Sequence, residues 1–369
     1  MSPQPGRTLS PDVPDVSNVP DATDVLDGPQ ERLPQSGARP SPLTTAREVD
    51  ELVRPALRRA VAELPAVVRQ VAEYHFGWSD DRGPTGGGKS LRSGLVLAAA
   101  RAVGGQARQA VPGAVAVELV HDFSLLHDDV IDGDRLRRHR PAAWVRFGTG
   151  AAVLAGDALW TLALQILVRA GDPAALDTLI RTMADLMRGQ SEDVAFESRD
   201  DVTAEEYLSM AEGKTGALLG GACAIGALLG GSSPDQAAQL ELFGRHLGVA
   251  FQCADDVLGI WGHPERTGKP VGSDVTARKK TFPVLAALTD RGSAGRRLAE
   301  MYRSPDRPGE RECAVMTGLI EQAGGRAAVE AEAERQVAMA LACLDRVELT
   351  PAGREELDLF ASRVVRRDH

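Results

Sequence analysis

The stretch that decides the fold is residues 118–140, which read ELVHDFSLLHDDVIDGDRLRRHR. Just before and within it, apolar residues recur at helical spacing, at Val115, Leu119, Phe123 and Leu126. This spacing predicts a helix that enters the core of the protein.

Three carboxylates, Asp128, Asp129 and Asp132, stand where the apolar pattern ends. Asp128 and Asp132 are four residues apart, so on a helix they share a face and repel each other. A solvated acidic helix end is one interpretation. The other is a cation site, because Mg²⁺ prefers carboxylate oxygens and often shares them with substrate phosphates. Arg137 and Arg138 follow at once and add guanidinium groups suited to phosphate.

A second stretch, residues 251–283, repeats this arrangement: FQCADDVLGIWGHPERTGKPVGSDVTARKKTFP. It places Asp255 and Asp256 on an apolar helical segment and follows them with Lys269 and Lys279. Two such segments, far apart along the chain, could face each other across a helical bundle and share Mg²⁺ around a diphosphate.

The composition bounds the fold and the function. The 369 residues are 43% hydrophobic but only 4% aromatic, which favours close-packed helices, and the net charge of −10 argues against nucleic-acid binding. The four cysteines form no CxxC pair, so neither zinc nor a disulfide framework is expected, and a cytoplasmic location is predicted. No apolar run reaches the ~20 residues of a membrane span, so no transmembrane segment is predicted.

Two regions are predicted. Residues 1–44 contain nine of the 22 prolines and few large apolar residues, so they are expected to form a disordered tail. The tail is either an inert extension or a docking segment that orders on a partner. Residues 45–369 are expected to form an all-α domain, a single large helical bundle around a central cavity.

Residues 83–90, GPTGGGKS, match the P-loop pattern of nucleoside triphosphatases. A P-loop needs a buried strand before it, and the preceding residues have a helical pattern instead. A triphosphatase is therefore disfavoured. The glycines also suit a helix start at which backbone N–H groups approach a phosphate.

Taken together, these motifs resemble those of the trans-isoprenyl diphosphate synthases, the polyprenyl synthetase family, from about Thr45 to the C-terminus. The resemblance implies the isoprenoid synthase type I fold and a homodimer. It implies Mg²⁺-dependent head-to-tail condensation of isopentenyl diphosphate with an allylic diphosphate. The expected product is short, geranylgeranyl diphosphate first and farnesyl diphosphate second. A class I terpene cyclase and a non-catalytic synthase subunit are the alternatives.

The resemblance also implies roles for individual residues. The metal ligands would be Asp128, Asp129, Asp132, Asp255 and Asp256, which with Lys214 form the catalytic set. The substrate-binding residues would be Lys89, Arg92, His121, Arg137, Arg138, Lys214, Thr215, Gln252, Lys269 and Lys279. Phe123 and Ser124, just before the first acidic motif, would limit the length of the product.

The chain departs from the family pattern at three positions. Gly259 stands where the second motif usually ends in Asp, which removes one carboxylate. Ser90 and Ser93 replace the usual Arg and Pro of the glycine-rich element. The tail, 1–44, resembles those of some enzymes enclosed by encapsulin-type shells, which implies a docking role and a location inside such a compartment.

Overall fold

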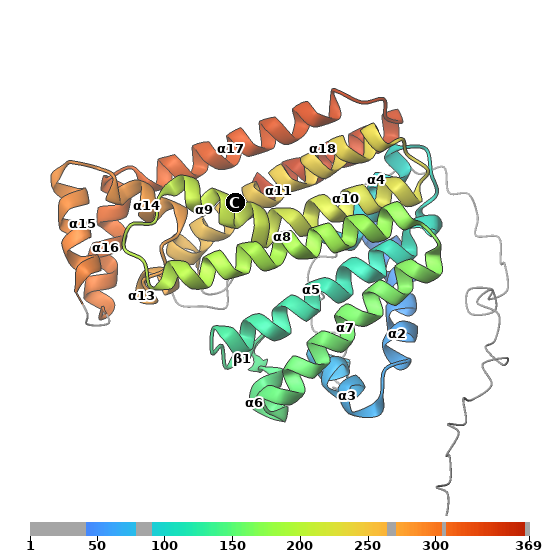
Figure 1. Cartoon of the computed structure of the whole chain (residues 1–369). Coiled ribbons are helices and arrows are strands. Elements are labelled where there is room, and N and C mark those ends of the chain that lie inside the picture. Colours follow the sequence, from blue (N-terminus) through green and yellow to red (C-terminus); the bar gives the residue numbers. More distant parts are fainter. Residues whose placement is uncertain (1–41, 79–90, 264–270, 305–307, 366–369) are drawn as a thin grey trace, which may run out of the picture. The chain divides into compact units, whose positions relative to one another are not determined.

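The structure, a computed structural model, describes residues 42–78, 91–263, 271–304 and 308–365. All of them belong to one compact unit, residues 39–369. Within these ranges the secondary structure is helical except for one short strand pair (Figure 1), which confirms the predicted all-α class. The predicted tail lies outside the described residues, apart from 42–44, which open the first helix.

The described chain begins with short helices that cover one side of the core. They are α1 (Pro42–Glu48), the π-helical segment η1 (Val49–Val53), α2 (Arg54–Ala62) and α3 (Ala66–His75). Their apolar stripe, which includes Val53, Leu57 and Val61, is buried. Helix α3 contacts α7, so this region is packed onto the long helices that follow.

Long helices form the centre of the unit. They are α4 (Leu91–Ala102), α5 (Val111–Ile131), α7 (Thr149–Ala170), α8 (Pro173–Glu197), α10 (Ala217–Leu229) and α11 (Pro234–Trp261), with the short η2 (Ala107–Ala110) and α6 (Ala143–Phe147) between them. Helix α10 contacts α4, α5, α8 and α11, and almost all of its residues are buried. Its sequence, ALLGGACAIGALL, is rich in small residues, which let neighbouring backbones approach closely.

Local signals set where the long helices begin. The Asp172 side chain accepts from the N–H groups of Ala174 and Ala175 at the start of α8. Ser233 and Gln236 cap each other at the start of α11. Such caps contribute about 1 kcal/mol each. They also fix the register of α8 and α11, which carry polar residues of the site.

The remaining elements complete the ends of the bundle. They are the strand pair β1 (Leu136–Arg137) and β2 (Arg140–Pro141), α9 (Ala204–Ala211), the π-helical segment η3 (Glu212–Gly216), α13 (Ser273–Thr276), α14 (Phe282–Leu288), α15 (Ser293–Arg303), α16 (Glu310–Gln322), α17 (Gly325–Leu344) and α18 (Pro351–Val365). Helix α17 lies along α11, and α18 packs on α4 (Figure 1).

Helix α7 is the one described helix that is long and apolar enough to cross a membrane, and 39% of its most apolar window is buried. A core helix of a soluble protein meets the same criterion. The buried residues of α7, such as Leu159, Leu162 and Ala163, face its neighbours, and α5 is a principal one.

The P-loop pattern, 83–90, lies outside the described residues. The helix α3 precedes it and α4 follows it, and no strand occurs in the described residues 42–78. The strand that a P-loop would need is therefore missing from the part of the chain described before it.

Candidate functional site

The first acidic segment lies at the C-terminal end of α5. Asp128 and Asp129 occupy its last turn, and Asp132 is its C-cap residue. The helix dipole disfavours negative charge at this end. Burial raises the pKa of Asp128 to about 6 and also raises the pKa of Asp132. This end of α5 therefore favours a nearby cation.

Arg137 partly meets this need from the strand β1. Its Nε donates to Oδ1 of the buried Asp129 over 2.9 Å. The other oxygen of Asp129, Oδ2, is buried and has no hydrogen-bond partner among the described residues. The turn after β1 holds Arg138 and His139 in the left-handed region, with φ of 52° and 62°. Non-glycine residues adopt that region at a cost, and such strain is found at binding sites.

Lys214 supplies a second cation from η3. Its Nζ lies 2.5 Å from Oδ2 of Asp193 on α8. Burial would lower the pKa of Lys214, but the carboxylates of Asp193 and Asp128 outweigh burial and raise it. Lys214 therefore remains charged while it lies between α8 and the first acidic segment.

The π-helical segment η3 is held in place by close backbone contacts. A Cβ on Gly189 of α8 would lie 2.7 Å from the carbonyl carbon of Gly213 and closer still to the backbone nitrogen of Lys214. A Cβ on Gly248 of α11 would lie 2.5 Å from Cα of Gly216. Only glycine fits such spaces, and π-helical turns recur at functional sites. These contacts fix the backbone that carries Lys214 and Thr215.

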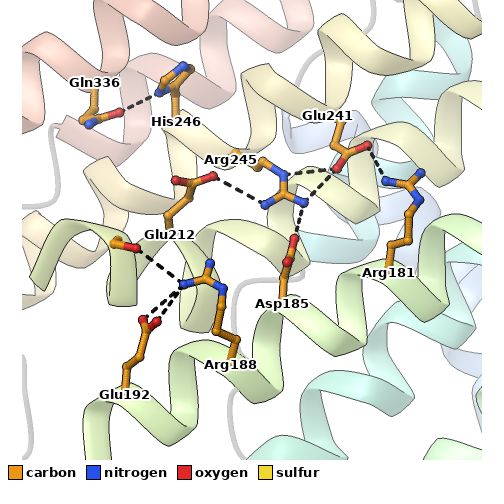
Figure 2. Close-up of polar contacts among 10 residues, drawn as sticks. Arg181, Asp185, Arg188, Glu192, Glu212, Glu241, Arg245, His246 and Gln336 are labelled. Atoms are coloured by element: carbon orange, nitrogen blue, oxygen red, sulfur yellow. Dashed lines mark hydrogen bonds and ion pairs between the residues drawn. The ribbon is translucent and has the colours of Figure 1, made fainter. Parts of the chain in front are cut away.

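A network of ion pairs supports η3 further along these helices (Figure 2). Arg245 of α11 contacts Asp185 of α8 at 2.5 Å, Glu241 of its own helix at 2.9 Å and Glu212 of η3 at 3.4 Å. Its side chain is 15% exposed, so these pairs are only partly screened by solvent. Arg245 thus ties three elements together near the turn that carries Lys214.

The second acidic segment lies on α11, and its second carboxylate is buried. The Tyr207 hydroxyl donates to both oxygens of Asp256, at 2.8 and 2.7 Å. Gln252 Nε2 donates at 3.0 Å and the backbone N–H of Phe282 at 3.1 Å. Burial still raises the pKa of Asp256 to about 7, although these hydrogen bonds oppose the shift. Asp256 therefore joins α9, α11 and α14.

Polar and charged residues of η3 and of the stretch after α13 act on the two acidic segments. Thr215, next to Lys214, donates to Oε1 of Gln252 over 3.0 Å, which links η3 to the second segment. Lys279, which follows α13, acts on the first segment, because its charge favours ionisation of Asp132. Asp255 is half-buried on α11 next to Asp256. The structure thus connects the first segment, η3 and the second segment.

A separate polar cluster surrounds His121 on α5. Arg92 Nη1 lies 3.2 Å from His121 Nε2. Burial and the Arg92 charge lower the pKa of His121 well below its ordinary value, so the ring is neutral at pH 7. Asp122 lies 3.2 Å from His75 and 3.8 Å from Arg138. A small cavity of about 10 Å³ next to it is lined in part by His75 and Arg138.

The two residues predicted to limit product length lie on α5, beside this cluster. The ring of Phe123 is buried, with its centroid 4.6 Å from that of His127 and 6.5 Å from that of Trp160 on α7. Ser124 donates to the carbonyl of His121 over 2.8 Å. Phe123 therefore faces α7.

Two predicted binding residues, Lys89 and Lys269, lie outside the described residues. The sequence did not single out Tyr207 or Asp122, which contact the predicted residues Asp256 and Arg138, or His75, which contacts Asp122. Tyr207 has no local motif. Asp122 could have been found from the sequence, because it directly follows His121 and the two polar residues interrupt an otherwise apolar helix.

The carboxylates at the end of α5 suit a divalent cation that is bound by the protein and by a substrate together. No group of three or more His, Cys, Asp or Glu side chains in the described ranges could hold a metal ion by itself. However, one buried oxygen of Asp129 lacks a hydrogen-bond partner within the part of the chain that the structure describes, and burial disfavours the charged form of Asp128. Mg²⁺ commonly uses one or two carboxylates and completes its shell with phosphate oxygens and water.

The long helices and the polar groups between them form the all-helical isoprenoid synthase fold. In keeping with this, the polyprenyl synthetase from Streptomyces coelicolor A3(2) superposes with a TM-score of 0.83 at 43% identity, covering 87% of this chain and 99% of that one. A family model described as polyprenyl synthetase matches residues 82–317.

Two proteins of similar sequence point to the same family. The chain is 45% identical over 326 residues to the (2E,6E)-farnesyl diphosphate synthase of Mycobacterium tuberculosis, covering 86% of this chain and 91% of the relative. It is 44% identical over 297 residues to the geranylgeranyl diphosphate synthase of the same species, covering 79% and 85%. The chain belongs to the polyprenyl synthetase family and is a prenyltransferase.

Proposed function

We propose that the chain condenses isopentenyl diphosphate head-to-tail with an allylic diphosphate and releases a short-chain trans-prenyl diphosphate. The observation that carries this proposal is the position of Lys214. This partly buried cation lies near the first acidic segment, and its neighbour Thr215 is bonded to Gln252 of the second. A diphosphate between the two segments would meet Lys214 from the side of η3.

The proposed reaction begins with loss of diphosphate from the allylic substrate. Lys214 and Arg137 stabilise the negative charge that grows on the leaving group, and Lys279 adds to it from the end of α13. Because these cations are fixed by Asp193, Asp129 and the backbone of η3, they need little reorganisation as the bond breaks. The double bond of isopentenyl diphosphate then attacks the allylic cation, and the resulting cation loses a proton to the released diphosphate, which completes the product.

The proposed cofactor is Mg²⁺. Asp128, Asp129 and Asp132 would hold it at the end of α5, with Asp255 on the opposite segment. When bound, it would neutralise charge on the diphosphate and so make it a better leaving group. Asp256 was predicted as a ligand too. Its oxygens accept four hydrogen bonds from Tyr207, Gln252 and Phe282, so we assign it the role of positioning α11.

A second diphosphate would bind at the cluster around His121. Arg92 and Arg138 provide guanidinium groups, and neutral His121 can donate or accept a hydrogen bond. Lys89 is proposed to contribute as well. A class I terpene cyclase has no need of this second site, so the Arg92–His121 pair favours a synthase. A non-catalytic subunit is disfavoured because the first acidic segment retains all three carboxylates.

We propose geranylgeranyl diphosphate as the main product and farnesyl diphosphate as the second choice. The support is Phe123, which precedes Asp128 by five residues, more than one helical turn. A growing chain that extends along α5 would meet this ring. Replacing it, Phe123→Ala, should lengthen the product. An unchanged product distribution would remove Phe123 from this role.

The function is tested by mass spectrometry of products made from isopentenyl diphosphate with each short allylic primer in turn, with and without Mg²⁺. The expected result is a prenyl diphosphate of up to 20 carbons, formed only when Mg²⁺ and both substrates are present. A hydrocarbon formed from the allylic diphosphate alone would indicate a cyclase instead.

We also propose a homodimer, formed through α7 and α8. Helix α7 exposes Leu154 and Val168, although its other face is buried. Helix α8 exposes Ile180, Met187 and Val194, which recur every seven residues and so share one face. Sedimentation should give twice the chain mass, and Val168→Asp together with Ile180→Asp should shift it to the monomer.

For the remaining regions the proposals rest on composition. We propose a cytoplasmic enzyme whose tail ends before residue 42 rather than at the predicted residue 44, because Pro42–Glu48 form α1 of the compact unit. Removing residues 1–41 should leave the prenyltransferase activity intact. If the tail docks to a protein shell of encapsulin type, the truncated enzyme will no longer copurify with that shell when the two are coexpressed.

A further inference from the structure

Position 259 on α11 has no side chain, and another residue fills its place. A Cβ built on Gly259 would lie 2.6 Å from Cγ of Asp274 and closer still to its Oδ2. Real Cβ atoms essentially never approach another heavy atom within 3.0 Å. The Asp274 carboxylate therefore occupies the space in which a side chain at position 259 would begin.

Helix geometry relates this carboxylate to the second acidic segment. Gly259 is four residues after Asp255, so the two positions share a face of α11, with Cβ atoms about 5–6 Å apart. The Asp274 carboxylate consequently lies one helical turn beyond Asp255. The short helix α13, which carries Asp274, packs against α11, and Ser273 donates to the carbonyl of Gly259 over 3.3 Å.

The carboxylate of the neighbouring Asp256 is already hydrogen-bonded to other residues. It is 2% exposed, and it accepts hydrogen bonds from Tyr207, Gln252 and the backbone of Phe282. Its oxygens point into the contact between α9, α11 and α14. The other two carboxylates on this side of α11 are those of Asp255 and of Asp274, which lies at position 259, one helical turn further along.

We propose that Asp274 supplies the carboxylate that position 259 lacks. In this assignment, Asp255 and Asp274 together hold the divalent cation that the second segment contributes to a bound diphosphate. The inference rests on the proposed function and deepens it. One carboxylate is moved from the helix α11 to the adjoining α13, and the number of oxygen ligands is preserved.

The first test measures metal binding directly. Mn²⁺ is titrated into the full chain in the presence of inorganic pyrophosphate, and free Mn²⁺ is followed by electron paramagnetic resonance. Asp274→Asn should weaken the binding of one Mn²⁺ roughly tenfold or more, the effect seen when groups around a metal are removed. The control is Asp235→Asn, a change at an exposed acidic residue in the first turn of α11, which should leave binding unchanged.

The second test moves the carboxylate back. Asp274→Ala should weaken Mn²⁺ binding, and adding Gly259→Asp should restore most of it, because the alanine vacates the space that an aspartate at 259 needs. Gly259→Asp alone should lower the melting temperature, since the two side chains would overlap. Circular dichroism of each variant verifies that it is folded.

Two results would overturn the inference. One is wild-type Mn²⁺ binding by folded Asp274→Asn. The other is failure of Gly259→Asp to restore binding in the Asp274→Ala background. Asp128→Asn separates this from the proposed function: if it weakens Mn²⁺ binding while Asp274→Asn does not, only the assignment of Asp274 fails. If the wild-type chain with pyrophosphate binds no Mn²⁺, the proposed function fails with it.

Discussion

The two acidic segments look alike in sequence, but the structure uses them differently. In the first, Asp128, Asp129 and Asp132 meet charged partners, because Arg137 pairs with Asp129 and Lys214 lies near Asp128. In the second, neutral donors hold the buried Asp256. An Asp–Asp pair thus belongs to a charged site on α5. On α11, one member of the corresponding pair, Asp256, instead holds neighbouring helices together.

The difference shows what burial does to an acidic motif. A buried carboxylate is stable only if its oxygens are hydrogen-bonded or a cation lies near. Asp129 retains one oxygen without a hydrogen-bond partner among the described residues, whereas both oxygens of Asp256 are bonded. The first segment is therefore expected to depend on charge, and the second on packing.

The largest effect should come from removing charge at the first segment. Asp128→Asn should lower kcat/KM by about a thousandfold, at the upper end of losses for a group that stabilises developing charge. Steady-state kinetics with both diphosphates provides the measurement, and Asp235→Asn is the matched control. A loss below tenfold would show that the first segment is not the charged site.

The next largest effect is expected at Lys214, which lies between the two segments. Lys214→Met should lower kcat/KM for the allylic diphosphate by roughly a hundredfold, because a partly buried cation near the leaving group is lost. Lys214→Arg should retain more activity. Equal losses in the two variants would indicate that the shape of the side chain matters, and its charge does not.

A smaller effect on activity is expected at the second segment. Tyr207→Phe removes one donor from buried Asp256 and should lower the free energy of unfolding by about 1–3 kcal/mol, the cost of a buried polar group that loses a partner. The reduction in kcat should be only a few-fold. Urea unfolding and steady-state kinetics on the same preparation separate the effect on stability from the effect on kcat. A loss of kcat as large as that in Asp128→Asn would contradict the comparison.

The last expected effect is on stability alone: the free energy of unfolding should depend on pH. The pKa of Asp256 is raised from 3.8 to about 7, so between those values the folded protein binds more protons than the unfolded chain. The free energy of unfolding should therefore fall as pH rises from about 4 to 7. Asp256→Asn should make this decline shallower. Urea unfolding of the wild type and of Asp256→Asn, in EDTA at several pH values, measures this decline. Identical slopes in the two proteins would refute the raised pKa of Asp256.

The sequence predicted the helices well, because apolar spacing is a local property. The helix around Leu119 and Phe123 is an example. It also identified both aspartate pairs. It did not predict that Tyr207 would bond to Asp256, because α9 and α11 meet only through packing. The π-helical turn at Lys214 had no signal of its own, since its shape depends on Gly189 and Gly248 in other helices.

For the same reason, the missing carboxylate at Gly259 was interpreted as a simple loss. Nothing in the spacing of residues 255–259 indicates that Asp274, in a separate short helix, would fill that space. A motif defined along one helix cannot report a side chain contributed by its neighbour.

The glycines beneath η3 have one more consequence. Lys214 is positioned by close contact between the η3 backbone and glycines on adjoining helices. A methyl group at Gly189 would collide with the backbone nitrogen of Lys214 and displace the turn, although every charged side chain of the site would be unchanged. Attempts to retune this enzyme by exchanging its charged residues will therefore act on a fixed scaffold. Substitutions at Gly189 or Gly248, in contrast, would move the ammonium group of Lys214 itself.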